Sequence, residues 1–220
     1  MKYFAQFPTI TTTDYKGNSI NVTNIMLRAE IVPKLLNDVM LFYKYDIKDS
    51  DTPDIISFKY YNDSNKFWLV PFSNQTIDPQ ADWPMNSSLF TDYLMDKYTA
   101  EANTHFSLPI GTNASPAQIL QYTQGTIKNY LKIMETTDSS TNESNTTTYI
   151  IDETAYNNTT LSNLSYPLPD GASVKVNVSV ATQSIYEYEV EQNEAKRNIN
   201  ILDTRYAGKI ESQLSALMRK

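Results

Sequence analysis

The chain is most informative between residues 45 and 62, which read Tyr45-Asp-Ile-Lys-Asp-Ser-Asp-Thr-Pro-Asp-Ile-Ile-Ser-Phe-Lys-Tyr-Tyr-Asn62. Alternating aromatic residues from Met40 to Ile47 predict a strand that leads into this segment. A helix start then follows, because Asp51 and Thr52 can cap it and Pro53 suits its first turn. We expect a strand followed directly by a helix.

The helix that begins near Pro53 is expected to place Ile55, Ile56 and Tyr60 on its inner face. The other predicted elements are, in chain order, an extended Thr-rich arm with a helix from Ile25 to Leu36, a short helix from Ser64 or Asn65, a helix from Ser88 to Tyr98, a short helix after Ser115-Pro116, strands at Ile127–Met134, Ser173–Val180 and Arg197–Leu202, and a C-terminal helix with Tyr206, Ile210, Leu214 and Leu217 facing inward. This mixture predicts the α+β class.

Four regions follow from this pattern. They are an N-terminal arm and helix (1–40), a small module of two strands and two helices (41–98), a β-rich segment (99–185) and a C-terminal strand and helix (186–220). Within the module, residues 45–89 are expected to supply both strands and both helices. Residues 136–148 are Ser- and Thr-rich and are predicted to form a polar, mobile loop. The acidic residues Glu187, Glu189 and Glu191 are interpreted as a solvated strand face.

Composition narrows the possible functions. The chain has 220 residues and a formal net charge of -7, which argues against binding to nucleic acid or to an anionic membrane. There is no cysteine, no apolar run long enough to cross a bilayer and no secretory signal pattern, so a soluble cytoplasmic protein is expected. The 16 tyrosines suit either partly wet protein interfaces or ordinary strands.

Signals for catalysis are weak. The only histidine is His105, and no glycine-rich phosphate-binding motif occurs. The carboxylates of Asp49, Asp51 and Asp54 resemble a glycosidase acid and base in type, but helix capping explains Asp51 and Asp54 without further assumption. We therefore predict a protein that is not an enzyme, with no catalytic residue, no cofactor and no metal site.

Residues 45–62 resemble the opening half of a LysM module, in which a strand is followed by Gly-Asp-Thr, a helix and a Tyr-Gly turn. The similarity continues through Phe67-Trp68, Asn74-Gln-Thr-Ile-Asp-Pro79 and Trp83-Pro84. Ser50 and Asn62 replace the usual glycines, and Asn62 can adopt the left-handed conformation that the turn needs. The resemblance implies a contact groove between two loops. Its candidate residues, for a partner or a glycan, are Asp51, Thr52, Asn74, Ile77, Asp78 and Trp83. Trp83 is expected to close the module core, with a partner anchor as the alternative.

A longer resemblance covers almost the whole chain. Phe7-Pro8-Thr-Ile, Asn24-Ile-Met-Leu-Arg28, the LysM-like segment, Asp82-Trp83-Pro84 and the ending from Tyr186 to Leu202 occur in the order found in the baseplate wedge family of T-even-like contractile-tailed phages, the product of gene fifty-three. This implies a structural virion subunit, assembled in the host cytoplasm, that joins neighbouring wedges around the tail hub. The implied partners are the sheath-initiating subunit, the wedge-core subunits and neighbouring wedges. The alternative is a LysM module that binds peptidoglycan or chitin.

Overall fold

Helices and strands alternate irregularly along the chain, which confirms the predicted α+β class. The computed structural model describes residues 7–26, 31, 38, 40–169, 171 and 173–218. The chain divides into two compact units, one formed by Met1–Ser87 with Asn193–Lys220 and the other by Ser88–Gln192. Most of the helix predicted from Ile25 to Leu36 lies outside the described residues.

The first unit contains two small sheets and five helices among its described residues. These elements are β1 (Thr9–Thr13), β2 (Ser19–Thr23), β3 (Phe42–Asp46), α2 (Pro53–Tyr61), the 3-10 helix η2 (Ser64–Lys66), α3 (Leu69–Ser73), α4 (Pro79–Asp82), β8 (Asn198–Leu202) and α9 (Thr204–Met218). Strands β1 and β2 form an antiparallel hairpin whose side chains are almost all exposed. The extended Thr-rich arm of the prediction is therefore this hairpin.

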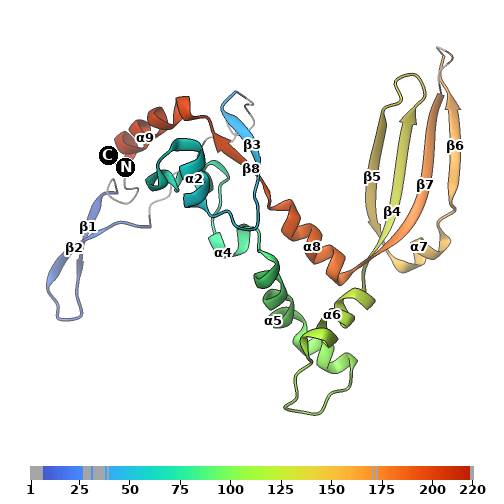
Figure 1. The fold of residues 1–220 in the computed structure, drawn as a ribbon, viewed down its shortest axis with the longest axis horizontal. Helices are drawn as coiled ribbons and strands as arrows, with labels where there is room; N and C mark the ends of the chain where they lie inside the picture. The colour runs from blue at the N-terminus through green and yellow to red at the C-terminus, as the bar shows by residue number, and fades with distance from the viewer. Residues whose placement is uncertain are drawn as a thin grey trace. The chain divides into compact units, whose positions relative to one another are not determined.

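Strand β3 pairs with β8, which follows it by about 150 residues (Figure 1). The pairing is antiparallel, with Phe42 opposite Leu202 and Asp46 opposite Asn198. The expectation that residues 45–89 supply both strands is wrong, because no strand is described between Ile47 and Ser87. The predicted strands at 40–47 and 197–202 are confirmed individually, and their partnership is the new information.

The main core of the first unit lies between this strand pair and the helices α2, α3 and α9. Its most buried side chains include Ile56 on α2, Leu69 on α3 and Ile201 on β8, each at 0% exposure. Asn62 ends α2 with a φ of 53°, so it adopts the left-handed conformation predicted for this turn. Both helices expected after β3 are present: the first is α2, and the second consists of η2 followed by α3.

Helix α9 packs only part of its predicted stripe. Leu214 is buried, and Tyr206 and Ile210 pack against the core. Leu217 is 64% exposed, so its predicted inward position is wrong. Ile55 on α2 is likewise 40% exposed rather than internal. Both residues lie on helices at positions that the sequence period alone does not separate from the buried face.

The second unit consists of helices and one four-stranded antiparallel sheet. Its elements are α5 (Ser87–His105), α6 (Pro116–Gly125), β4 (Ile127–Asp138), β5 (Ser144–Ile151), α7 (Glu153–Asn158), β6 (Ser162–Pro167), β7 (Ser173–Ser184) and α8 (Ile185–Ala195), with α5 and α8 crossing the boundaries between the units. The strand order is β5-β4-β7-β6 (Figure 1). The helices predicted at 88–98 and after Ser115-Pro116 are confirmed, as are the strands at 127–134 and 173–180.

Two predictions in this unit are wrong. Residues 136–148 are not a loop, because most of them belong to β4 and β5, which a short turn joins. Threonine is β-branched and favours strands, so its abundance marks a polar strand here rather than disorder. The segment with Glu187, Glu189 and Glu191 is helix α8 rather than a strand, and Glu189 is only 4% exposed.

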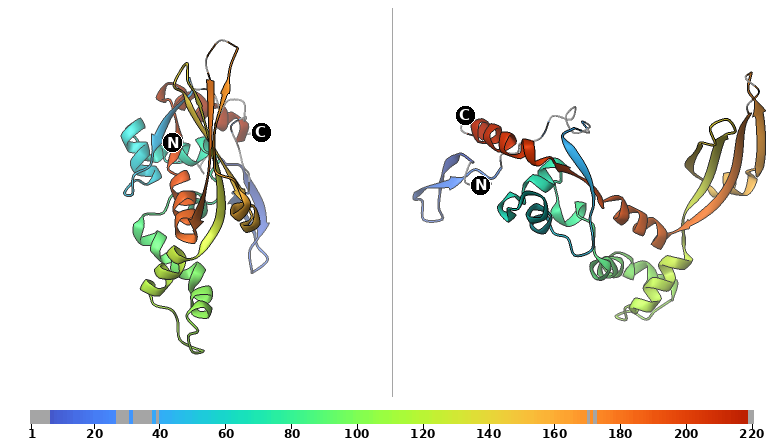
Figure 2. Two further views of the ribbon diagram at one scale, coloured as in Figure 1. Left: turned by 90° about the vertical axis from the view of Figure 1, so that its right-hand side faces the viewer. Right: turned by 45° about the horizontal axis from the view of Figure 1, so that its top comes forward.

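The sheet of the second unit is a single layer, seen nearly edge-on in the left view of Figure 2. Val174, Val176, Val178 and Val180 lie on one face of β7, because side chains alternate along a strand. Helix α7 packs at one end of this face, where the rings of Tyr130 and Tyr156 are 5.0 Å apart. The four valines are half-buried.

Candidate functional site

Asp51, a predicted contact residue, is buried instead of facing a partner. Its carboxylate accepts hydrogen bonds from the Tyr45 hydroxyl (2.6 Å), the Lys48 backbone amide (3.1 Å) and the Lys59 ammonium (2.6 Å). Burial favours a raised pKa, but the bonds from Lys59 and Tyr45 outweigh it and lower the pKa of Asp51. Asp51 therefore fastens β3 to α2 in its ionised form.

Thr52 is the residue that precedes α2, as predicted for a cap, and it is exposed. Its side chain makes no capping bond to a backbone amide, because the hydroxyl donates to the Asp54 carboxylate instead. Of the two predicted capping residues, Thr52 occupies the cap position, whereas the Asp51 carboxylate accepts from Tyr45, Lys48 and Lys59 instead, and the predicted capping bond is not formed. Thr52 is therefore a solvent-exposed residue at the end of the first predicted contact loop (49–52).

Asn74, the first residue of the second predicted contact loop (74–79), joins this loop to strand β8. Its side-chain amide donates to the carbonyl oxygens of Val70 (2.8 Å) and Asn200 (2.9 Å), and its oxygen accepts from the Asn200 amide (2.7 Å). The two bonds to Asn200 imitate a strand partner, so Asn74 extends the edge of β8 with a side chain. Both the amide nitrogen and the oxygen that Asn74 could offer to a glycan are already engaged in these bonds.

The remaining three predicted residues follow Asn74 along the chain. Ile77 is 70% exposed, and Asp78 caps α4 by accepting from the Gln80 amide at 2.9 Å. Trp83 is half-buried and packs against the main core, which confirms core closure. The structure thus gives internal roles to Asp51, Asn74 and Trp83. Thr52, Ile77 and Asp78 are the members of the predicted set that lie at the surface.

Arg197 and Asp203 hold the module together from the C-terminal side, and the sequence interpretation missed both roles. Arg197 donates to the Ile47 carbonyl oxygen (3.0 Å) and pairs with Asp49 (2.7 Å), across about 150 residues of sequence. Asp203 accepts from the Tyr43 hydroxyl at 2.9 Å and pairs with Arg205. The bonds from Arg205 lower the pKa of Asp203. No local sequence signal marks the bonds to Ile47, Asp49 and Tyr43, because each joins β3 or its loop to the distant β8 region.

Exposed apolar side chains on the module are the feature best suited to contact another protein. Ile55 and Phe58 lie three residues apart on α2 and are 40% and 57% exposed. Phe67, just after η2, is 45% exposed. We call these three residues the apolar outer set. A large exposed aromatic on a folded helix is a common anchor in protein interfaces.

The second unit contains a buried cluster of one carboxylate and three hydrogen-bond donors. Glu189 on α8 accepts hydrogen bonds from the hydroxyls of Tyr93 (2.9 Å) and Tyr98 and from the ammonium of Lys97 (2.8 Å), all on α5. Burial favours a raised pKa, but the bonds from Lys97, Tyr98 and Tyr93 lower the pKa of Glu189. The cluster therefore ties α5 to α8 through one ionised carboxylate.

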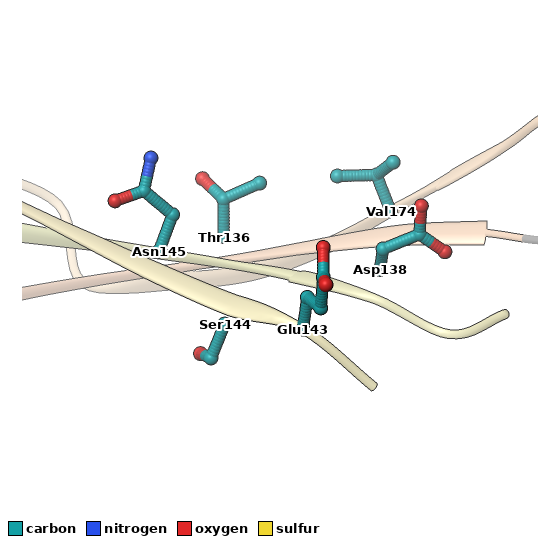
Figure 3. Close-up of a pocket in the computed structure, with 6 residues that line it drawn as sticks. All are labelled: Thr136, Asp138, Glu143, Ser144, Asn145 and Val174. Atoms are coloured by element: carbon teal, nitrogen blue, oxygen red, sulfur yellow. The ribbon is translucent and has the colours of Figure 1, made fainter. Parts of the chain in front are cut away.

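Metal-binding clusters and membrane-spanning helices are both absent from the part of the chain that the structure describes. There, no group of three or more histidine, aspartate or glutamate side chains is arranged to hold a metal ion. No described helix is long and apolar enough to span a membrane. One open hollow lies near the turn between β4 and β5, and its lining residues are Thr136, Asp138, Glu143, Ser144, Asn145 and Val174 (Figure 3).

Two comparisons with known proteins bear on the family to which the chain belongs. A search of curated proteins finds no match. The family model described as base plate wedge protein 53 matches residues 3–220, nearly the full length. A match of this extent includes the β3–β8 module and the second unit alike. The chain therefore belongs to the base plate wedge protein 53 family and is a structural protein of the phage tail baseplate.

Proposed function

We propose that the chain joins neighbouring baseplate wedges around the central hub and performs no catalysis. Its partners would be the other wedge subunits, namely the sheath-initiating subunit, the wedge-core subunits and the adjacent wedges, and it would assemble with them in the host cytoplasm. The family assignment supports association with baseplate components in general. The apolar outer set supports direct protein contact.

We also propose that β3, α2, α3 and β8 form a LysM-like module divided by an insertion. A strand, two helices and an antiparallel strand follow one another in the order that this module requires. In this chain, residues 88–192 intervene before the last strand. The module would then serve as a clamp whose ends are fixed by Asn74 and Arg197.

The alternative of glycan binding is not favoured by any observation on the described residues. The buried carboxylate of Asp51 already accepts hydrogen bonds from Tyr45 and Lys59, and the side chain of Asn74 is hydrogen-bonded to the backbone of Asn200. Two of the polar side chains expected to meet a sugar are therefore committed to the fold. The apolar outer set carries the proposal instead, because it exposes a phenylalanine on each of two neighbouring elements.

Replacing both Ile55 and Phe58 with serine tests this proposal. Because both side chains are exposed, the free energy of unfolding should change by no more than about 1 kcal/mol, roughly the sum of two surface changes. Incorporation into baseplates should fall strongly if the set is an anchor. The measurement is the amount of the variant that co-purifies with the wedge subunits of the same phage after co-expression.

The matched control is Leu120→Ser, which alters a side chain that is 42% exposed on α6 in the second unit. This control should leave incorporation unchanged and report any general effect of lost apolar surface. Normal incorporation of a folded Ile55→Ser/Phe58→Ser variant would contradict the role of the apolar outer set.

A further inference from the structure

Strand β5 forms one edge of the four-stranded sheet and is open to pairing. It spans Ser144–Ile151, and among the described strands β4 is the only one that it pairs with, in the sheet order β5-β4-β7-β6. Every residue from Ser144 to Ile150 is exposed. An edge strand presents a row of unpaired backbone donors and acceptors, which is a ready template for another strand.

The sequence of β5 lacks the features that normally block edge pairing. It reads Ser-Asn-Thr-Thr-Thr-Tyr-Ile-Ile, with no charged residue and no proline, and the four residues at its centre are all β-branched or aromatic. The opposite edge, β6, is shorter and ends in Pro167. Folded proteins usually protect an edge with charges, proline or a bulge. Strand β5 is therefore the less protected of the two edges of this sheet.

The open edge continues an apolar face of the sheet. Tyr149 pairs with Lys132, and Thr147 pairs with Met134, which in turn lies opposite Val178. Directly opposed residues share a face, so Tyr149 and Met134 are on the same face as the valines of β7. A strand added at β5 would extend this face if its residues alternated between apolar and polar.

Both ends of β5 are acidic. Asp138 and Glu143 lie at the turn that precedes it, and their carboxylates are on the same side as Thr136 and Val174, whereas Ser144 points to the other side (Figure 3). Asp152 and Glu153 follow its other end. None of these four carboxylates takes part in a salt bridge among the described residues. A partner segment with a basic residue at each end would neutralise them.

A second copy of this chain is a poorer occupant than a basic-ended segment. Among antiparallel pairs of β5 strands that keep the apolar faces together, those centred on Thr147 or on Thr148 pair the most residues. Counting along the sequence, Glu143 of one copy then comes next to Asp152 or opposite Glu153 of the other. Like charges placed opposite each other destabilise strand pairing.

We propose that β5 is a docking edge for an extended segment of another baseplate subunit, which pairs with it as an added strand. The segment has an uncharged, β-branched centre and a lysine or arginine at each end. Main-chain hydrogen bonds supply the affinity of such a contact, and the flanking charges select the partner. This inference rests on the proposed function, because it assigns one surface through which the chain contacts a neighbouring subunit.

The test uses the full chain and two synthetic peptides. Both have alternating valine and threonine residues at the centre, and one carries lysines at both ends while the other carries glutamates. The lysine-ended peptide should slow hydrogen exchange of the β5 amides. It should also bind roughly threefold to tenfold more tightly than the glutamate-ended peptide, the effect expected for a few exposed ion pairs.

The charge selection is checked with the variant Glu143→Lys/Asp152→Asn. The asparagine side chain introduced in place of Asp152 keeps an oxygen that can accept from the Ala155 amide at the start of α7, so that helix stays capped. The preference for the lysine-ended peptide should weaken markedly in this variant, because two of the four carboxylates are removed and the ammonium introduced at position 143 offsets Asp138. Equal binding of the two peptides to the unmodified chain would overturn the basic-ended partner.

Two other outcomes would also overturn the proposal. One is the absence of added protection in β5 at saturating peptide. The other is self-association of the chain, seen by sedimentation, in which β5 becomes protected as concentration rises without peptide. Each is distinct from failure of the proposed function, because the incorporation measurement with Ile55→Ser/Phe58→Ser does not involve β5.

Discussion

Replacing Ile201 with alanine should lower the free energy of unfolding of the first unit by about 2–5 kcal/mol, the range for large-to-small changes in a core. Ile201 is completely buried on β8, opposite Tyr43 of β3, and belongs to the main core. The change removes apolar contacts at the point where the two distant parts of the chain meet. Urea unfolding followed by tryptophan fluorescence measures it selectively, because both tryptophans, Trp68 and Trp83, lie in the first unit.

The matched control is Ile10→Ala, the same chemical change on a strand residue of the first unit that is 45% exposed. It should alter the free energy of unfolding by less than about 0.5 kcal/mol, as is usual for surface positions. An Ile201→Ala variant as stable as this control would contradict the assembly of the module from β3 and β8. The comparison therefore separates loss of core packing from loss of isoleucine in a strand.

The local elements of the first unit could be predicted because their signals are local. The polar residues before α2 and the proline at its first position mark a helix start, and an asparagine that tolerates positive φ marks its end. Neither depends on the rest of the chain. The strand at 198–202 was also visible from its alternation, and it is buried as that pattern requires.

The pairing of β3 with β8 could not be predicted in the same way. Nothing in Phe42–Asp46 specifies a partner, and the partner lies beyond an entire second unit. The same separation in sequence explains why the roles of Arg197 and Asp203 could not be predicted. Their hydrogen bonds join the β8 region to β3 and its loop. Long-range hydrogen bonds leave no periodic pattern in a sequence, so the candidate site was only partly visible.

The two wrong predictions for the second unit have a different cause. Threonine and serine are frequent both in disordered segments and in polar strands, so composition alone misplaced residues 136–148. Alternating Glu and Tyr residues at 186–191 suggested a strand face, yet the segment is helical and buries its middle carboxylate. A buried glutamate needs donors from elsewhere, and these come from α5, about 90 residues earlier.

Replacing that carboxylate, in Glu189→Gln, should lower the free energy of unfolding of the second unit by about 1.5–3 kcal/mol at neutral pH, the range for hydrogen bonds to a charged group. Glutamine keeps the shape but loses the charge that Tyr93, Lys97 and Tyr98 recognise. Burial favours a raised pKa, but the bonds from Lys97, Tyr98 and Tyr93 outweigh it and lower the pKa of Glu189 in the folded chain from its ordinary, unfolded value of 4.5. Its stabilisation is therefore complete above that unfolded value and is lost as the pH falls through the folded pKa.

The difference between the unmodified chain and Glu189→Gln should consequently shrink below about pH 4, where protonation removes the same charge. Urea unfolding followed by circular dichroism at neutral and acidic pH measures both effects, with tryptophan fluorescence reporting the first unit separately. Glu101→Gln on the exposed side of α5 is the control and should show neither effect. A difference that stays constant from neutral to acidic pH would mean that packing of the side chain, and not its charge, holds α5 to α8.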